Sequence, residues 1–265
     1  MPELPEVERA VRQLRPVMEG ARFERVLVRR RRLRTLLRSS FAARLDGTRV
    51  EALRRRGKYL VADLSTGDTL VMHLGMSGSF EVHRGEVILT KHDHVVFYMS
   101  NGATVVFNDP RRFGSMWLHD SRTQTNPIAR LGPEPLDDTF GAEVLAEALR
   151  RRRAPLKAAL SDQRIVAGLG NIYVSEALHR ARLSPRRAAG TLTSPSGAPR
   201  RPLHMLVRAI RDTLNDALVE RAEGDDRFRV YDREGERCPR RGCRGRIRRI
   251  VQAGRSTFFC PVCQR

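Results

Sequence analysis

The chain begins with Met1-Pro2-Glu3-Leu4-Pro5-Glu6-Val7-Glu8, the stretch from which we interpret its fold and its chemistry. Removal of Met1 would leave Pro2 with a free secondary amine, and a chain-terminal amine has a pKa near ~8. Such an amine is partly unprotonated at neutral pH, so it can attack an electrophilic carbon and form a Schiff base. Glu3 and Glu6 would lie beside it as acid, base or electrostatic partner. The alternative is an ordinary helix start, where proline and acidic residues are favoured.

Outward from this stretch, residues 5–19 have the apolar spacing of an amphipathic helix, and Gly20 is a typical C-terminal residue. This helix would hold Pro2 in place against a core. From Phe23 to about His119 the pattern changes to short β runs separated by turn residues, at 25–28, 59–64, 69–73, 95–99 and 104–108. The sequence therefore predicts an α+β protein whose N-terminal domain, residues 2–120, is a helix followed by an antiparallel β-sandwich.

Two turns in the β region carry side chains that are unusual at turn tips. Residues 73–78 form a glycine-rich turn that contains Met76, and residues 108–114 form a turn that contains Arg111 and Phe113. Apolar side chains in such places are suited to enter a base stack when a nucleotide is extruded. The alternative is that Met76 and Phe113 fold back into a local core.

The charge of the chain predicts a polyanionic partner. The 265 residues include 50 Lys and Arg against 30 Asp and Glu, which gives a net charge of +20 and a pI near 11.3. Nucleic acid is the usual partner of such a protein, although a basic bias of the genome is an alternative. Only three of the 50 basic residues are lysines, and because lysine can shift its pKa these positions are places to look for chemistry: Lys58, Lys91 and Lys157.

The sequence also predicts where the protein is found. No apolar run approaches ~18 residues, and no signal-peptide pattern opens the chain. We therefore expect a cytoplasmic protein without a membrane partner.

The second half of the chain has helical periodicity. Residues 121–139 contain three X-Pro pairs and are predicted to be a linker. Helices are expected at 140–152, 156–161, within 165–180 and at 202–220, which together make a helical DNA-binding domain at 140–235. The turn Gly168-Leu169-Gly170-Asn171 would open a helix with Asn171 at its N-terminus, a geometry that binds phosphate through free backbone amides.

The last part of the chain, residues 236–265, has the spacing of a zinc ribbon. A C-x4-C pair is followed after sixteen residues by a C-x2-C pair, formed by Cys238, Cys243, Cys260 and Cys263. We expect one structural zinc ion, because four thiolates leave no open position for catalysis; disulfides or free thiols are the alternatives. Residues 245–259 between the pairs are predicted to be a basic β-hairpin that contacts phosphates.

Together these segments resemble the formamidopyrimidine-DNA glycosylase / endonuclease VIII family of base-excision repair enzymes. The first eight residues and the two turns at 73–78 and 108–114 resemble the formamidopyrimidine branch more than the endonuclease VIII branch. The resemblance runs in family order over nearly the whole chain. It rests on Pro2-Glu3-Leu4-Pro5-Glu6-Val7-Glu8, Arg56-Gly57-Lys58-Tyr59-Leu60, residues 73–78, Lys91-His92-Asp93-His94, residues 109–114, Leu131-Gly132-Pro133-Glu134-Pro135, residues 168–173 and the ribbon. It implies a helix-two-turn-helix domain in the second half.

The resemblance also implies roles for single residues. Pro2 would be the nucleophile, Glu3 the proton donor at the sugar, Lys58 a participant in β-elimination and Arg255 in δ-elimination. The positions that match DNA contacts are His92, Arg111, Arg152, Lys157 and Asn171. Met76, Arg111 and Phe113 would fill the gap that a flipped nucleotide leaves, with Arg111 facing the orphaned base. The implied partner is double-stranded DNA containing damaged bases or abasic sites, bound by a monomer.

Two departures from the family pattern bear on function. The first cysteine pair is spaced x4 where the family usually has x2, which zinc tolerates. The segment at 221–228 is shorter than the glycine-containing lid that members acting on 8-oxoguanine usually carry, so the substrate is open. The alternatives are an endonuclease VIII-like enzyme for oxidised pyrimidines, a non-catalytic damaged-DNA-binding protein, and an RNA-binding zinc-ribbon protein.

Overall fold

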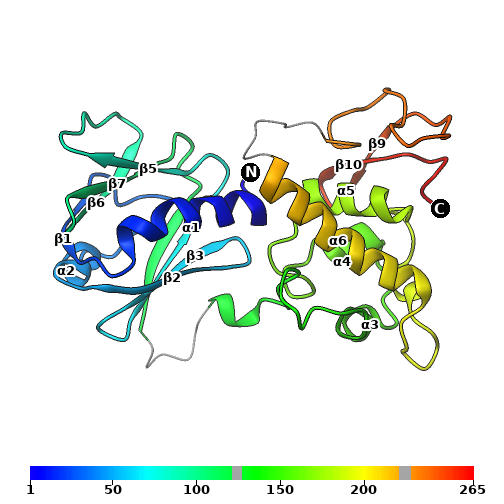
Figure 1. Ribbon diagram of the computed structural model, residues 1–265, viewed down its shortest axis with the longest axis horizontal. Helices are drawn as coiled ribbons and strands as arrows, with labels where there is room; N and C mark the ends of the chain where they lie inside the picture. Colours follow the sequence, from blue (N-terminus) through cyan, green and yellow to red (C-terminus); the bar gives the residue numbers. More distant parts are fainter. Residues whose placement is uncertain (121–126, 221–227) are drawn as a thin grey trace. The chain divides into compact units, whose positions relative to one another are not determined.

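The computed structural model describes residues 1–120, 127–220 and 228–265 (Figure 1). The chain divides into two compact units, Met1–Ala129 and Arg130–Arg265, which we describe separately. The domain boundaries expected after residues 120, 139 and 235 remain predictions. Of the predicted linker, residues 121–126 lie outside the described residues, and Pro127–Arg130 form a short 3-10 helix, η1. None of the described helices is both long and apolar enough to span a bilayer.

The first unit contains the predicted N-terminal helix and antiparallel β-sandwich. One sheet has the order β1-β6-β7-β5 and the other the order β2-β3-β4-β8, and neighbouring strands within each sheet are antiparallel. Apolar side chains of both sheets and of the N-terminal helix form one core. The elements are α1 Leu4–Met18, β1 Phe23–Val28, α2 Phe41–Leu45, β2 Val50–Arg56, β3 Tyr59–Leu64, β4 Thr69–His73, β5 Ser79–Arg84, β6 Asp93–Met99, β7 Ala103–Asn108 and β8 Ser115–His119.

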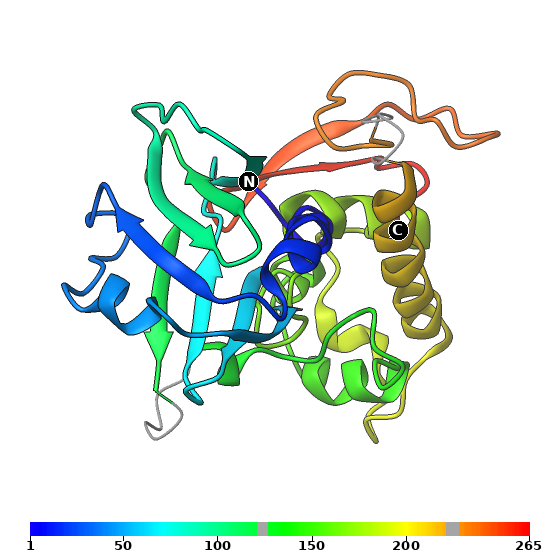
Figure 2. The same cartoon turned by 60° about the vertical axis from the view of Figure 1, so that its left-hand side comes forward.

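Helix α1 forms where its apolar spacing predicted, and it is fixed to β2 by polar contacts as well as by packing. Its buried side chains Val7, Val11, Leu14 and Met18 recur at intervals of three or four residues, so they share one face. Glu19 is the C-cap, and Gly20 follows it with a φ of 79° that suits glycine. Figures 1 and 2 both show α1 lying along the strands that include β2.

The second unit holds the helices and the ribbon. The helices are α3 Ala142–Leu149, α4 Leu156–Leu160, α5 Asn171–Ala181 and α6 Arg201–Glu220, with a 3-10 turn η2 at Ala189–Leu192. The ribbon hairpin consists of β9 Arg248–Gln252 and β10 Arg255–Phe259. Helix α3 is shorter than the predicted 140–152, because Gly141 is its extended N-cap and Arg150 leaves the helical conformation. Helix α5 packs against both α6 and β10.

Candidate functional site

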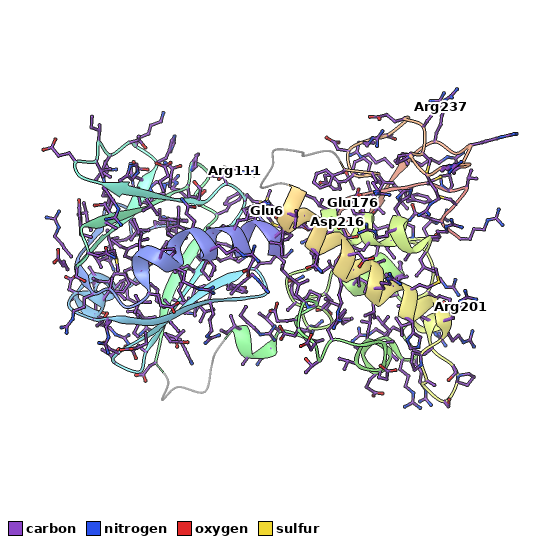
Figure 3. The ribbon with its side chains drawn as sticks, in the orientation of Figure 1. Glu6, Arg111, Glu176, Arg201, Asp216 and Arg237 are labelled. Carbon is purple, nitrogen blue, oxygen red and sulfur yellow. The ribbon has the colours of Figure 1, made fainter. Side chains whose placement is uncertain are left out.

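The N-terminus is held rigidly by the first turn of α1. Glu3 is the N-cap and is 1% exposed; its backbone N–H donates to Glu6 Oε2 at 2.8 Å, and the Glu6 backbone N–H donates to the Glu3 carboxylate in return. Figure 3 shows Glu6 in this turn. The helix-start interpretation is therefore confirmed, and the capping box also fixes half-buried Pro2 beside two carboxylates. Met1 precedes Pro2, so the secondary amine arises only when Met1 is removed.

Contacts between α1 and β2 set the direction in which the N-terminus points. Near the end of α1, Glu19 Oε2 accepts the Leu53 backbone N–H at 3.0 Å. Near its start, Glu8 Oε2 accepts Arg55 Nε at 3.0 Å in an ion pair whose side chains are 19% and 8% exposed. The helix therefore runs antiparallel to β2, and its first half lies beside the end of the strand at which the next turn begins.

That turn carries Lys58. Gly57 and Lys58 connect β2 to β3, between the paired residues Arg56 and Tyr59, and Gly57 has the φ of 58° that a tight hairpin needs. Lys58 is only 7% exposed. The structure thus places Lys58 in the same part of the unit as the start of α1, in a buried environment where a lysine can take part in acid–base chemistry.

His73 is a further member of this region that the sequence did not single out. Its ring lies 4.9 Å from that of Tyr59, and its Nδ1 accepts the Gly75 backbone N–H at 2.9 Å, so a neutral ring carries its proton on Nε2. Burial, together with the positive charges of Lys58 and Arg34, lowers the pKa of His73 from 6.5 to about 4. The imidazole is therefore neutral at physiological pH. Its pairing to Tyr59 across β3 and β4 is what brings it close to Lys58.

The two predicted wedge turns are joined by Asp109, which is fully buried. Asp109 Oδ1 accepts the Ser77 hydroxyl at 2.6 Å, and Oδ2 accepts the Gly114 backbone N–H at 2.7 Å. Ser77 Oγ in turn accepts the Arg111 backbone N–H at 3.2 Å. One carboxylate therefore holds the turn at 73–78 and the turn at 108–114 together.

The wedge candidates project from this joined pair of turns. Met76 is 38% exposed and Phe113 is 43% exposed, so the alternative in which they fold back into a local core is wrong. The guanidinium carbon of Arg111 lies 4.8 Å from the centre of the Phe113 ring, a cation–π contact. A Cβ at Gly75 would lie 2.3 Å from the backbone carbon of Phe113, so only glycine permits the turns to approach this closely.

His92 lies beside the same turns, because its backbone carbonyl accepts the Asp109 N–H at 3.0 Å. In the second unit, Arg152 is exposed beyond the end of α3, with its Nε donating to the Ala148 carbonyl at 2.7 Å. The structure therefore leaves the Arg152 guanidinium at the surface of its unit.

Lys157 and Asn171 form a buried connection between the helices and the ribbon. Lys157, 2% exposed, donates from Nζ to Asn171 Oδ1 at 2.5 Å, to Thr257 Oγ1 at 2.7 Å and to the Ser256 carbonyl at 3.3 Å. Asn171 Nδ2 donates to the Ser256 carbonyl at 3.0 Å. An ammonium has three donors, and three acceptors meet them here, so a phosphate would reach Lys157 only by displacing one.

Arg255 is exposed at the start of β10, next to the turn at Ala253 and Gly254. It lines one cavity of about 230 Å³ together with Lys157, Ser161 and Gln252. Exposed arginines also occur along the rest of the hairpin, at Arg246, Arg248 and Arg249. The ribbon therefore presents a cationic surface suited to phosphates.

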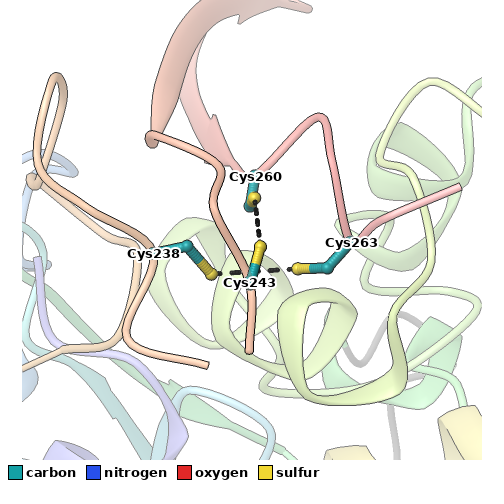
Figure 4. Close-up of side chains that lie close together, drawn as sticks. All are labelled: Cys238, Cys243, Cys260 and Cys263. Carbon is teal, nitrogen blue, oxygen red and sulfur yellow. Dashed lines mark hydrogen bonds between the residues drawn. The ribbon is translucent and has the colours of Figure 1, made fainter. Parts of the chain in front are cut away.

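The four cysteines converge as a zinc site requires (Figure 4). Their Sγ atoms all lie within 4.8 Å of one another, with Cys238 and Cys263 at 3.8 Å and Cys243 and Cys260 at 3.6 Å. A zinc–sulfur bond of 2.3 Å in tetrahedral geometry requires sulfur–sulfur distances of about 3.8 Å. The donor set and its spacing fit one zinc ion, and the x4 spacing of the first pair does not prevent this.

Residues 221–227, most of the segment that the sequence identified as a shortened lid, lie outside the described residues. The backbone just after this segment is hydrogen-bonded to a side chain of α5. The Glu176 carboxylate, 6% exposed, accepts the backbone N–H groups of Arg229, Val230 and Tyr231, each at 2.9 Å. This carboxylate fixes the chain as it enters the ribbon.

Comparisons with known proteins agree with this arrangement. Residues 1–116 match the formamidopyrimidine-DNA glycosylase N-terminal domain, residues 131–227 the H2TH domain of the same enzyme, and residues 235–265 the zinc finger found in FPG and IleRS. A formamidopyrimidine-DNA glycosylase of Azorhizobium caulinodans is 53% identical over 295 residues, with both chains covered in full. The alignment has 295 positions and this chain has 265 residues, so at least 30 positions of the relative have no counterpart in this chain.

Solved structures of the Lactococcus lactis enzyme are similar over the full length of both chains. One, non-covalently bound to DNA containing an AP site, has a TM-score of 0.85 at 31% identity. Another, a mutant bound to DNA containing Fapy-dG, has a TM-score of 0.85 at 30% identity. The fold and the cysteine cluster are thus those of a DNA glycosylase of base-excision repair with a zinc finger. This chain belongs to the formamidopyrimidine-DNA glycosylase family, whose enzymes have glycosylase and AP-lyase activity.

Proposed function

We propose that this chain excises oxidised bases through its N-terminal proline and then cleaves the strand by β,δ-elimination. In this mechanism the Pro2 amine, freed of Met1, attacks C1′ of the damaged nucleotide, and the base leaves with the electron pair of the glycosidic bond and takes up the proton that the amine loses. Glu3 donates a proton at O4′ as the sugar ring opens, and the secondary amine and C1′ become an iminium. Lys58 then takes part in β-elimination and Arg255 in δ-elimination.

The observation that carries this proposal is the fixed start of α1. The Glu3–Glu6 capping box and the part-buried Glu8–Arg55 pair hold Pro2 on a fixed element that runs along β2, the strand that precedes buried Lys58. A covalent mechanism needs a nucleophile held within a fraction of an ångström of its target. A protein that only binds damaged DNA has no need of such a fixed, potentially unblocked amine.

DNA binding follows from the surfaces of each unit. In the first, exposed Met76, Arg111 and Phe113 would enter the duplex, with His92 at the base of their turns. In the second, Arg152, Arg255 and the N-terminus of α5 at Asn171 would contact phosphates. Lys157 would act mainly by supporting Asn171 and the hairpin.

Borohydride trapping tests the covalent step directly. With an abasic-site duplex, reduction should fix the protein to DNA, and Pro2→Gly protein or protein that retains Met1 should form no such adduct. The matched control is Pro16→Gly, which alters a proline at the far end of the same helix and leaves the amine intact. Trapping that persists through another amine in the Pro2→Gly protein would contradict the mechanism, and its complete absence in wild type would favour the non-catalytic DNA-binding alternative.

We propose that formamidopyrimidines or oxidised pyrimidines are excised faster than 8-oxoguanine. Helix α6 ends at Glu220 and the Glu176 anchor begins at Arg229, which leaves few residues to cover an extruded purine. Discrimination in such enzymes depends on hydrogen bonds to the base, so a substrate that needs less cover should react faster.

Single-turnover rates on four duplexes measure this preference: an abasic site, a formamidopyrimidine, an oxidised pyrimidine and 8-oxoguanine opposite cytosine. Excision of 8-oxoguanine as fast as the formamidopyrimidine would remove the argument from the short segment. A preference for the oxidised pyrimidine would favour the endonuclease VIII-like alternative. We further propose that the enzyme acts as a monomer in the cytoplasm, where thiols stay reduced and available to zinc.

A further inference from the structure

A histidine from outside the ribbon contacts the zinc site. His179 lies in the last turn of α5, and its Nε2 is 3.4 Å from Cys238 Sγ. Both side chains are buried, at 1% and 6% exposure. Helix α5 and the ribbon belong to the same unit, so this contact joins the helical part of the unit to the metal centre.

The chemistry of the two groups decides the direction of the hydrogen bond. A cysteine that binds zinc is a thiolate, which can only accept. Nε2 must therefore carry the proton of the neutral ring, and His179 Nδ1 has no hydrogen-bond partner among the described residues. A buried imidazole that leaves one nitrogen unpaired in order to aim the other at sulfur is not placed there by packing alone.

The backbone around His179 is held as well. Arg240, which lies between the first two cysteines, donates from Nη2 to the His179 carbonyl at 2.6 Å. At the other end of α5, Asn171 contacts β10 through the Ser256 carbonyl. The helix is thus attached to the ribbon at both ends, and its His179 end is attached through a metal ligand.

We propose that His179 is an outer-shell residue of the zinc site, which donates an Nε2–H···Sγ bond to the Cys238 thiolate and thereby retains the metal. Four thiolates around Zn²⁺ carry a net charge of −2, and each N–H···S bond withdraws negative charge from sulfur. The Gly245 N–H to Cys243 Sγ contact at 3.4 Å is a donor of the same kind within the ribbon. Loss of such partners in zinc proteins typically weakens metal binding by about 10–100-fold.

Variants of the full-length zinc-loaded protein test this. His179→Phe keeps an aromatic ring but has no donor, and it should release zinc to a chromogenic chelator at least about tenfold faster than wild type. His179→Gln places an amide N–H near Nε2 and should restore slow release. His204→Phe, at an exposed position on α6, is the matched control and should leave release unchanged. Zinc release from His179→Phe at the wild-type rate would overturn the proposal.

Two spectroscopic measurements separate a hydrogen bond from packing. In cobalt-substituted protein the sulfur-to-cobalt charge-transfer band should move to lower energy in His179→Phe and return in His179→Gln; a band that does not move indicates a packing role and contradicts the proposal. If His179→Phe does not fold, a measurement on the wild-type protein still tests the proposal. NMR of its ¹⁵N-labelled, ¹¹³Cd-loaded form should show the His179 proton on Nε2, coupled to cadmium through Cys238, and a proton on Nδ1 would overturn the assignment.

Discussion

Asp109→Asn should separate the two wedge turns while it changes the shape of the side chain very little. The native carboxylate accepts from Ser77 Oγ at 2.6 Å and from the Gly114 N–H at 2.7 Å. A hydrogen bond to a charged group contributes about 1.5–3 kcal/mol and a neutral one about 0.5–1.5 kcal/mol. An asparagine can accept only through one oxygen, so its amide nitrogen faces Ser77 and both contacts become neutral. We expect a loss of about 2–3 kcal/mol, or roughly 10 °C in the melting temperature of the first unit.

The functional consequence should depend on whether a base has to be extruded. Excision of a formamidopyrimidine should slow by at least about tenfold, because the wedge offsets an extrusion cost of a few kcal/mol. Cleavage at a preformed abasic site should slow less, since no base needs to be unstacked. Single-turnover rates on the two duplexes, measured well below the melting temperature, give the ratio.

The matched control is Asp68→Asn, at the opposite end of β4, where the carboxylate pairs with Arg44 at 2.6 Å. That partly exposed pair should contribute about 1 kcal/mol or less, and the ratio of the two rates should stay at the wild-type value. Equal losses of excision and abasic-site cleavage in Asp109→Asn would show general destabilisation. An unchanged melting temperature would show that the Asp109 carboxylate does not hold the two turns together. A double-mutant cycle with Ser77→Ala should give a coupling energy of about 0.5–3 kcal/mol.

Three further predictions concern other parts of the chain. Phe113→Ala should slow excision at least about tenfold with little loss of stability, because the ring is 43% exposed; a loss of roughly 3 kcal/mol in chemical denaturation would instead indicate a core role. The pKa of His73 falls from 6.5 to about 4 on folding, so the unfolded chain binds more protons between these values. Stability present above pH 6.5 should therefore decline by up to about 3 kcal/mol as the pH falls to 4, and His73→Gln should lessen this decline when the two pH profiles of unfolding are compared. Lys157→Arg should destabilise the second unit by about 2 kcal/mol or more and weaken binding to undamaged DNA, whereas Arg152→Lys should leave the melting temperature unchanged; a stable Lys157→Arg protein would contradict the fit of the ammonium to its three acceptors.

The sequence predicted best those elements whose own residues decide the structure. Strands β3 and β4 have the predicted bounds, because apolar runs end at clear turn signals. Strand β2 was missed because Val50 and Leu53 are its only fully buried residues and three arginines close it. Strand β5, an edge strand with Phe80 alone fully buried, was missed for the same reason.

The candidate site divides in the same way. The cysteine spacing and the unusual turn tips are local patterns, so they were visible in the sequence. The parts played by Asp109 and His179 come from partners 32 and 59 residues away, Ser77 and Cys238, and no local pattern contains that information. His73 became visible only when the pairing of β3 and β4 placed it near Lys58.

The burial of Lys58 and Lys157 gives a physical reason for lysine at these positions in a chain whose basic residues are mostly arginine. Among the Lys and Arg residues whose burial the structure describes, those buried as whole residues are Lys58 and Lys157, although lysine supplies three of the 50 basic residues. A guanidinium has five donors in a rigid plane, and a buried arginine must satisfy all of them, whereas an ammonium is compact and has three. At Lys157 three acceptors from α5 and β10 meet that number. Enclosure does not require lysine everywhere, because the Arg55 side chain is 8% exposed in its ion pair with Glu8. Exposed Lys91 shows in turn that lysine is not confined to buried positions. A compact ammonium therefore suits the two positions that are buried as whole residues, and burial at Lys58 favours a group that can exchange a proton.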